Sequence, residues 1–320
     1  MNRNSLRRAI APAAVGVSLA FTLAACGGQN GGAAAGEGSS GSVAVDGSST
    51  VFPLSDAAAE LLNEQNPNVK VTVASSGTGG GFESFCAGKT DISNASRPIK
   101  EDEEVPVCEK NKVDFTELTV ATDALTVVVN KDFPVDCITT EQLTTMWEPA
   151  AQGKVTNWKQ VDPSFPDADL KLFGPGADSG TFDYFTDEIN GEEGASRSDY
   201  EASEDDNVIV DGVANTEGAL GYFGFTYYEE NADKLKALEV DSGEGCVAPS
   251  VETAQSGEYT PLARPLFIYV ANKSYTDKPQ VKEYVDYYVE NLTDIAEAAE
   301  YIPLNDEQLG KTKSALEGIK

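Results

Sequence analysis

One stretch, residues 75–82 (Ser-Ser-Gly-Thr-Gly-Gly-Gly-Phe), most constrains the fold of this chain. It separates a β-prone run at 69–74 from a helix-like run at 82–86. Glycine lets a backbone approach a ligand closely, and a helix N-terminus offers unpaired N–H groups with a partial positive charge. The stretch therefore fits an anion site, although a purely structural turn explains the same residues equally well.

The residues around this stretch alternate between strand and helix. Strands are expected at 41–46, 69–74 and 91–95, and apolar residues at helical spacing fill 54–62. This βαβαβ order predicts an α/β protein with a largely parallel sheet and helices on both faces. Residues 101–114 are predicted to be an acidic loop.

Residues 115–129 are strongly β-prone but interrupted at 122–124, which indicates two strands that cross between two lobes. After them the alternation continues. Strands are expected at 170–173, 219–225 and 265–270, and helices at 140–147, 182–189, 208–214, 281–292 and 304–316. Residues 192–206 are expected to be an acidic loop, where a calcium site is a weak alternative because EF-hand spacing is absent.

The first 41 residues have the composition of an export signal and a tether. Basic residues precede an apolar run that ends in Leu-Ala-Ala-Cys at Cys26, which predicts a signal peptide over 1–25. The ending resembles a bacterial lipobox, in which Cys26 is lipidated; an ordinary signal peptide with an incidental cysteine is the alternative. Residues 26–41 are mostly Gly, Ala and Ser and are expected to form a flexible tether. We therefore expect an extracytoplasmic protein that is lipid-anchored to the bacterial cell membrane.

Composition excludes several classes of function. With 53 acidic and 23 basic residues the formal net charge is −30, which argues against nucleic acid as a partner. The chain has no histidine, which removes Ser-His-Asp triads and nearly all zinc sites. The commonest hydrolase designs are therefore excluded.

Four cysteines remain beside Cys26, at positions 86, 108, 137 and 246. An even number in an exported protein predicts two disulfides. Spacing alone does not choose among the three pairings.

Four motifs occur in a family-specific order, at 47–53 (Gly-Ser-Ser-Thr-Val-Phe-Pro), 75–82, 95–99 (Ala-Ser-Arg-Pro-Ile) and 174–182 (Gly-Pro-Gly-Ala-Asp-Ser-Gly-Thr-Phe). Together they resemble the phosphate-binding lipoproteins of high-affinity phosphate ABC transporters, the PstS family, and most closely its SphX-like branch. The resemblance covers essentially everything after the tether. It implies a monomer that captures inorganic phosphate and delivers it to the permease and ATPase subunits of such a transporter. We therefore expect a binding protein without cofactor or metal and not an enzyme. A surface phosphoester hydrolase with an activated Ser or Thr is the less favoured alternative.

The resemblance also implies a two-lobed type II periplasmic-binding-protein fold with two crossover strands at the hinge. Lobe 1 would comprise 42–121 plus 264–320, and lobe 2 would comprise 122–263. Under this division the pairings Cys86–Cys108 and Cys137–Cys246 each stay within one lobe, whereas the other pairings would tie the lobes together. We therefore expect these two disulfides.

The same resemblance implies a phosphate site of mostly neutral donors, because a site that must release its ligand needs few fixed charges. One wall would come from 49–52, a second from 78–79 and a third from 179–181. The expected contacts are Ser49, Thr50, Val51, Phe52, Thr78, Gly79, Arg97, Asp178, Ser179, Gly180 and Thr181. Each hydroxyl has a simple helix N-cap as its alternative.

Two positions depart from the pattern of some family members. Arg97 stands where they carry an aspartate, and Pro175 stands where they carry an arginine. Arg97 is therefore expected to supply the bidentate cation, with an ordinary surface ion pair as its alternative. An acceptor for the proton of hydrogenphosphate would then be Asp178 or Asp123. Another tetrahedral oxyanion such as sulfate, or a phosphate-sensing role, remains an alternative.

Overall fold

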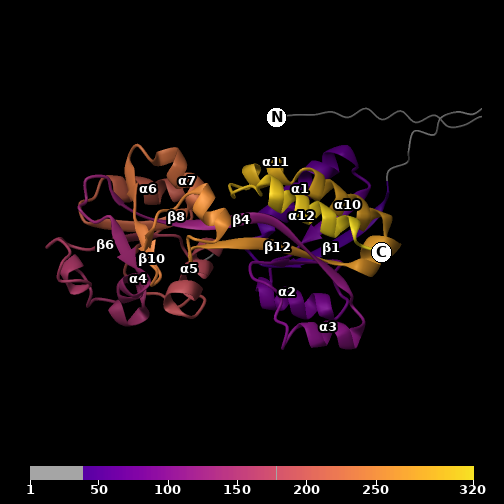
Figure 1. Ribbon diagram of the computed structural model, residues 1–320, viewed down its shortest axis with the longest axis horizontal. Coiled ribbons are helices and arrows are strands. Elements are labelled where there is room, and N and C mark those ends of the chain that lie inside the picture. Colours follow the sequence, from indigo (N-terminus) through magenta and orange to yellow (C-terminus); the bar gives the residue numbers. More distant parts are fainter. Residues whose placement is uncertain (1–38, 178) are drawn as a thin grey trace, which may run out of the picture. The chain divides into compact units, whose positions relative to one another are not determined.

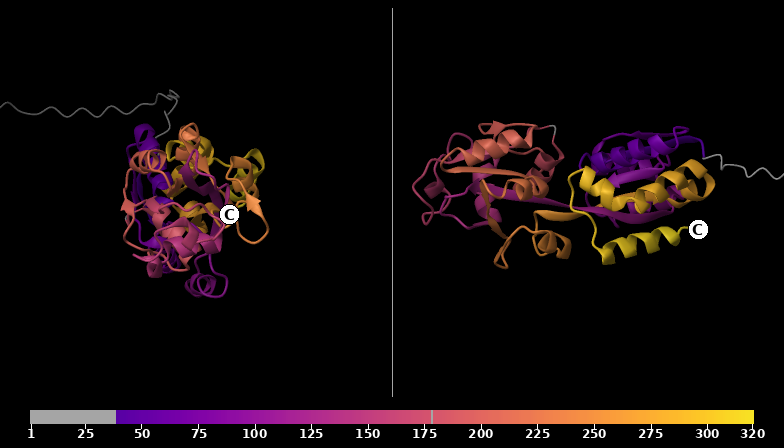
Figure 2. Two further views of the ribbon diagram at one scale, coloured as in Figure 1. Left: turned by 90° about the vertical axis from the view of Figure 1, so that its left-hand side faces the viewer. Right: turned by 90° about the horizontal axis from the view of Figure 1, so that it is seen from above.

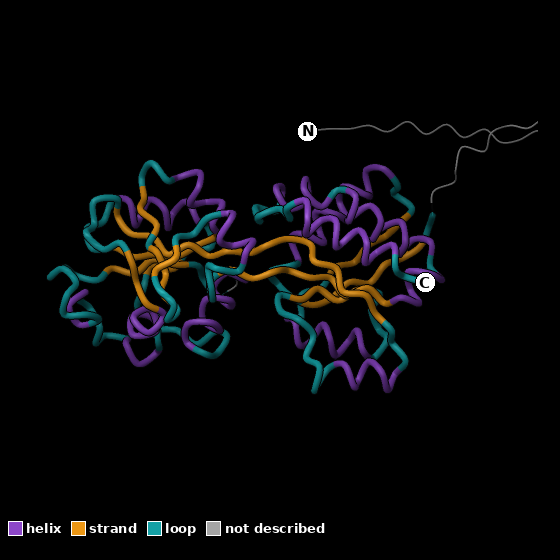
Figure 3. The backbone as a smooth tube through the Cα atoms, in the orientation of Figure 1, coloured by secondary structure: helices purple, strands orange, loops and turns teal. Residues whose placement is uncertain are grey.

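Two strands, β4 (Phe115–Asn130) and β12 (Ala263–Ala271), pass between two groups of helices and tie them into one unit (Figure 1, Figure 3). β12 pairs antiparallel with β4 from Phe115 to Ala124, and the rest of β4 pairs with strands of the second group. The computed structural model describes residues 39–177 and 179–320. The strand pair is the frame on which both halves of the fold are built.

The first half, which we call lobe 1, is a parallel sheet extended by β12. β1 (Gly41–Gly47) lies between β2 (Val69–Val73) and β3 (Ile92–Ala95) and is parallel to both, as predicted, while β12 joins β3 antiparallel. Figure 1 shows α1 and α10–α12 on one face and α2 and α3 on the other. The helices of lobe 1 are α1 (Phe52–Gln65), α2 (Gly77–Cys86), α3 (Val105–Asn111), α9 (Asn272–Asp277), α10 (Pro279–Glu290), α11 (Leu292–Ala298) and α12 (Asp306–Glu317).

The second half, lobe 2, is built on the far end of β4. There β4 pairs with β8 (Ala219–Gly224) and β9 (Leu235–Ala237), and β8 leads to β6 (Lys171–Gly174) and β7 (Glu201–Ala202). A small sheet consists of β5 (Cys137–Thr139), β10 (Glu239–Asp241) and β11 (Cys246–Val247). The helices are α4 (Thr140–Trp147), η1 (Pro149–Ala151), η2 (Trp158–Gln160), α5 (Gly180–Asn190), α6 (Asp206–Ala214), α7 (Phe225–Asn231) and α8 (Val251–Ser256).

Each lobe has its own apolar core, as the repeated strand–helix pattern requires. In lobe 1, α1 and α10–α11 pack on the sheet around residues such as Leu54 and Ile268. In lobe 2, Trp147, Phe185 and Tyr222 form a buried aromatic cluster, with Phe185 stacked on Tyr222 at 3.8 Å between ring centres. Figure 2 shows from above how β4 and β12 connect these two parts. The residue boundaries expected for the lobes stay a prediction.

Three local expectations were wrong. The 115–129 run is one continuous strand, because Thr122, Asp123 and Ala124 keep their pairing with β12. Residues 101–114 contain α3, which begins with a proline in its first turn and buries Cys108. The glycines of 77–81 are not a loop before a helix but the first turns of α2 itself.

Both disulfide pairings are confirmed. Cys86 is bonded to Cys108 in lobe 1, and Cys137 is bonded to Cys246 in lobe 2. Cys26, the expected lipidation site, lies outside the described residues. Within the part that the structure describes, no helix has the length and apolar character needed to cross a bilayer.

Candidate anion-binding cleft

A polar cleft of about 370 Å³ brings together residues of both lobes. It is bounded by the segment before α1, the first turn of α2, the β3–α3 connection, α5 and β12. Its lining is Ser48, Ser49, Thr50, Ser76, Gly77, Thr78, Gly79, Ser96, Arg97, Asp183, Tyr184, Asp187, Glu188, Glu193 and Arg264. Five of the ten described residues predicted for an anion site line this cleft: Ser49, Thr50, Thr78, Gly79 and Arg97.

The turn before α1 begins where β1 ends against β3. Gly47 has φ +142°, and a Cβ there would lie 2.1 Å from the carbonyl oxygen of Asn94, so only glycine fits. The Phe52 N–H donates to the Ser48 carbonyl at 3.0 Å, which corrects the expectation that this amide is free for a ligand. The amides of Ser49, Thr50 and Val51 donate to no acceptor among the described residues, and the first two of these residues line the cleft. They are the N–H groups this turn offers to an anion.

The first turn of α2 approaches the same place. A Cβ on Gly81 would lie 2.5 Å from the Gly47 Cα, so glycine is needed for α2 to pack this closely against β1. Thr78 Oγ1 accepts from the Ser96 N–H at 3.2 Å and lies 3.0 Å from Ser96 Oγ. These hydrogen bonds hold the Thr78 hydroxyl in place at the cleft. The first turn of α2 contains no acidic residue, so its N–H groups, including that of Gly79, are not opposed by a negative side chain of the same turn.

Helix α5 supplies the third wall through Asp183, Tyr184, Asp187 and Glu188, whereas Ser179, Gly180 and Thr181 at its start are not among the lining residues. Ser179 is the N-cap and accepts from the Thr181 N–H at 3.2 Å. A Cβ on Gly180 would lie 3.0 Å from Thr50 Oγ1, so this glycine faces the α1 turn directly. Thr181 lines a separate cavity of about 160 Å³. Asp178 lies outside the described residues.

Arg264 of β12 is the cation among the cleft residues that the sequence did not reveal. Its Nη2 donates to Thr50 Oγ1 at 3.1 Å, and its Nε donates to Asp123 Oδ2 at 3.3 Å. Its guanidinium lies 3.4 Å from the ring centre of Tyr184 on α5. One side chain therefore contacts lobe 1, the strand pair and lobe 2. The only signal in the sequence is a basic residue beside the apolar run 265–270.

Asp123 holds Arg264 from the neighbouring strand. Its side chain is 7% exposed, and burial raises the pKa of its carboxyl group while the Arg264 guanidinium lowers it. Because the carboxylate is paired, Arg264 is fixed in place and most of its charge is balanced. This fits a site that attracts an anion without holding it permanently.

Arg97 lines the cleft, but its guanidinium is already occupied. Nη2 and Nη1 donate to the two carboxylate oxygens of Glu104 at 2.8 and 3.0 Å, and the group lies 5.6 Å from the Phe82 ring centre. Glu104 is the N-cap residue of α3, the helix that the sequence did not predict. The expected fork of two free N–H groups on Arg97 is therefore not present in this conformation.

Four carboxylates line the lobe 2 side of the cleft: Asp183, Asp187, Glu188 and Glu193. Ser49 Oγ donates to Asp183 at 3.5 Å. Burial raises the pKa values of Asp183 and Glu188, and Glu193 adds to the effect at Asp183. This wall can accept a proton or a hydrogen bond from a protonated oxyanion, and it repels a fully ionised one.

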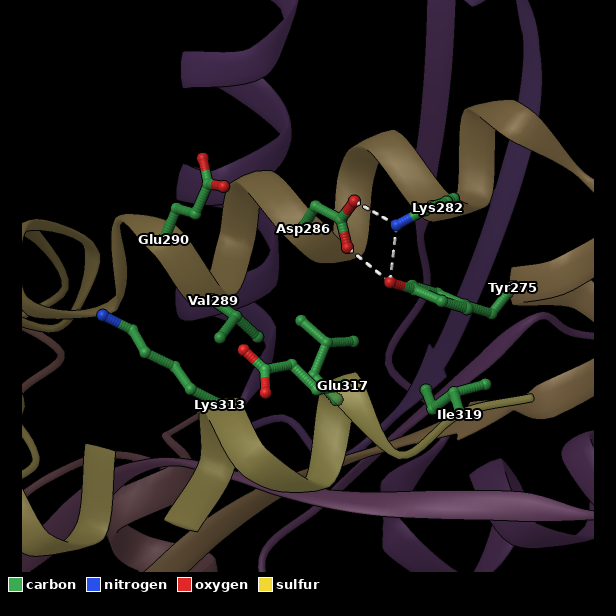
Figure 4. Close-up of a pocket in the computed structure, with 9 residues that line it drawn as sticks. Tyr275, Lys282, Asp286, Val289, Glu290, Lys313, Glu317 and Ile319 are labelled. Carbon is green, nitrogen blue, oxygen red and sulfur yellow. Dashed lines mark hydrogen bonds and ion pairs between the residues drawn. The ribbon is translucent and has the colours of Figure 1, made fainter. Parts of the chain in front are cut away.

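A larger cavity of about 630 Å³ lies elsewhere, between α10 and α12 (Figure 4). Its lysine Lys282 is already paired, since it bonds to Asp286 at 2.6 Å and to the Tyr275 hydroxyl at 2.8 Å. No helix N-terminus of lobe 2 reaches it. In the described ranges, Cys137, Glu239 and Cys246 form the one group with metal-ligand spacing, and its two cysteines are joined in a disulfide. The cleft is the better candidate site.

The fold and the cleft define a class: a two-lobed α/β binding protein whose lobes meet at a polar, anion-adapted site. A family model described as a PBP superfamily domain matches residues 32–291. The protein SphX of Synechococcus elongatus is 51% identical over 82% of this chain and 77% of its own length. The phosphate-binding protein PstS of Staphylococcus saprophyticus is 40% identical over 96% of this chain and 92% of its own.

A solved structure is similar as well. The crystal structure of a possible phosphate binding protein from Planctomyces limnophilus superimposes with a TM-score of 0.82 at 43% identity, covering 87% of this chain and 98% of that one. The chain belongs to the PBP superfamily and, within it, to the family of PstS and SphX.

Proposed function

We propose that this protein captures inorganic phosphate in the cleft and delivers it to the membrane permease and ATPase subunits of a phosphate ABC transporter. The observation that carries the proposal is the convergence on Thr50 of the Arg264 guanidinium and the N-terminus of α5 at Gly180. Cationic and N–H donors that meet at one hydroxyl form a site for a small oxyanion. The relatives named as phosphate-binding proteins support phosphate as that anion.

Within this proposal the donors are divided between the walls. Ser49 and Thr50 with the Val51 amide serve one side, Thr78 with the Gly79 amide the second, and Ser179 with Gly180 the third. Arg264 supplies the cation. Arg97 contributes positive potential at the rim, and it could bind the anion directly only by leaving Glu104.

Selectivity requires a carboxylate that accepts the proton of hydrogenphosphate, because sulfate carries no proton at neutral pH. Asp183 suits this role, since it lines the cleft beside Ser49. Asp123 is less suited, because Arg264 already donates to one of its oxygens. Asp178 stays a candidate from the sequence alone.

The rest of the proposal concerns the location, the membrane anchor and the oligomeric state of the protein. Its relatives are binding proteins, and we place this chain outside the cytoplasm, held at the membrane by a lipid on Cys26 and acting as a monomer without catalysis. Mass spectrometry of the membrane fraction tests the lipid: a diacylglyceryl-modified Cys26 supports the anchor, and an unmodified cleaved chain overturns it.

Isothermal titration calorimetry on phosphate-depleted protein tests the ligand. We expect one phosphate per chain with a dissociation constant in the micromolar range or below, and sulfate binding at least 100-fold weaker, which is about 2.7 kcal/mol. Equal affinity for the two anions would end the phosphate assignment. Absence of heat with phosphate would end the oxyanion-binding function itself.

A further inference from the structure

Tyr301 lies between α11 and α12 and is not among the residues that line the cleft, but it contacts the main chain of the lining residue Thr50. Its hydroxyl donates to the main-chain carbonyl of Thr50 at 2.8 Å. That carbonyl belongs to the same peptide unit as the Val51 N–H. A contact at this carbonyl therefore acts on a donor of the proposed phosphate site.

The peptide geometry makes the link specific. The described cis peptide is Thr260–Pro261, so the Thr50–Val51 peptide is trans. In a planar trans peptide the C=O and N–H bonds point in opposite directions. With its carbonyl held by Tyr301, the Val51 N–H must point away from Tyr301. Donation into a carbonyl also polarises the peptide and strengthens its N–H as a donor.

The position of Tyr301 is itself fixed on three sides. Its N–H donates to the Ala296 carbonyl at 2.9 Å. The neighbouring Ile302 exchanges two hydrogen bonds with Thr122 of β4, at 2.9 and 3.1 Å. The carbonyl of Glu300, on the other side, accepts from Thr226 Oγ1 at 2.8 Å. A hydroxyl carried by such a segment has little freedom to leave Thr50.

We propose that Tyr301 is a positioning residue for phosphate: by holding the Thr50 carbonyl it directs and strengthens the Val51 N–H that binds the anion. The inference rests on the proposed function, because it concerns the affinity of that same site. It assigns to a residue outside the cleft a part in ligand binding.

Tyr284 offers a matched control. Its hydroxyl also donates to a main-chain carbonyl of the same segment, that of Ser55, at 2.7 Å. Ser55 is not part of the cleft lining. Tyr301→Phe and Tyr284→Phe therefore each delete one hydroxyl-to-carbonyl hydrogen bond, but only the first deletes it behind a proposed phosphate donor.

The experiment is calorimetric titration of phosphate into the wild type and both variants, with thermal unfolding of each. We expect Tyr301→Phe to weaken phosphate binding roughly 3- to 10-fold, the effect of one hydrogen bond, while Tyr284→Phe binds as the wild type does. Equal affinity of Tyr301→Phe and wild type would overturn the inference. If the wild type itself does not bind phosphate, it is the proposed function that fails.

A second measurement needs no variant. In a ¹H–¹⁵N spectrum of the wild type, saturation with phosphate should move the Val51 amide proton downfield, because a charged acceptor deshields its donor. If phosphate binds and the Val51 amide does not shift, Val51 is not a donor and Tyr301 has nothing to position.

Discussion

Arg264 Nη2 donates to Thr50 Oγ1 at 3.1 Å, so a residue of the strand pair between the lobes meets the turn that starts α1. Asp123 and Tyr184 hold the same guanidinium from β4 and from α5. Because Arg264 contacts both lobes, an anion bound to it is placed where the lobes meet. We therefore expect ligand binding to be coupled to closure of the lobes.

The two arginines that line the cleft should differ sharply in importance. Arg264→Lys keeps the charge but loses the fork that reaches Asp123 and Thr50 together, so phosphate affinity should fall roughly 10- to 100-fold. Arg97→Gln should change affinity no more than about threefold, because Arg97 is paired with Glu104. Calorimetry on both variants checks this. A larger loss in Arg97→Gln would show that Arg97 leaves Glu104 and takes the role expected from the sequence.

The two threonines at the α1 and α5 starts offer a second comparison. Thr50→Val removes a hydroxyl at the centre of the cleft and should weaken phosphate binding roughly 10-fold or more. Thr181→Val changes a side chain that lines the separate cavity and should leave affinity unchanged. Fluorescence titration with phosphate measures both. A comparable loss in Thr181→Val would place its hydroxyl on the ligand after all.

Asp199 should stabilise lobe 2 in a pH-dependent way. Arg197 is 4% exposed, and its hydrogen bonds lower the pKa of Asp199 to about 2. Because the folded-state pKa lies below the ordinary value of 3.8, this stability is present near neutral pH and is lost as pH falls toward 2. Asp199→Asn should cost about 2 kcal/mol at pH 7 and roughly half as much at pH 3 by urea unfolding. The exposed pair Asp167–Lys159 supplies the control, since Asp167→Asn should cost almost nothing at either pH.

Asp206, at the start of α6, should have the opposite pH dependence. Burial, Glu300 and neighbouring acidic groups raise its pKa from 3.8 to about 6. A carboxyl group with a raised folded-state pKa is relatively stable when protonated, so the wild type should lose stability as pH rises from about 4 through 6. Relative to the wild type, the free energy of unfolding of Asp206→Asn should therefore increase by about 1 kcal/mol between pH 5 and pH 8. The increase is limited because the helix N-terminus offsets part of the cost of burying the charged carboxylate. Asp211→Asn, exposed on the same helix, should show no such trend.

Much of the fold was predictable because its elements are local. The βαβαβ order of lobe 1 follows from apolar spacing and turn residues, and the structure confirms β1, β2 and β3 as parallel neighbours. The 101–114 region was less readable, because α3 is only seven residues long and depends on the burial of Cys108 rather than on a long apolar stripe. Short elements of this kind are decided by tertiary packing.

The site was predictable where its residues sit in motifs and was hidden where they do not. Thr50 and Thr78 come from Gly-rich turns, which the sequence marks. Arg264 becomes part of the cleft only because β12 pairs with β4 and places it beside Asp123, a contact across 141 positions of sequence. Glu104 similarly pairs with Arg97 because it lies at the start of α3, a helix that was not predicted from the sequence. A sequence motif can be recognised locally, whereas the partner of a charged side chain is known only once the sheet has brought distant segments together.

A crystal structure of the protein with phosphate tests the central claim most directly. We predict one phosphate between the lobes, with its oxygens within hydrogen-bonding distance of Arg264 Nη2, Thr50 Oγ1 and the Val51 N–H. Phosphate bound only away from these three groups, or a cleft without phosphate at a concentration that saturates binding in solution, would contradict it.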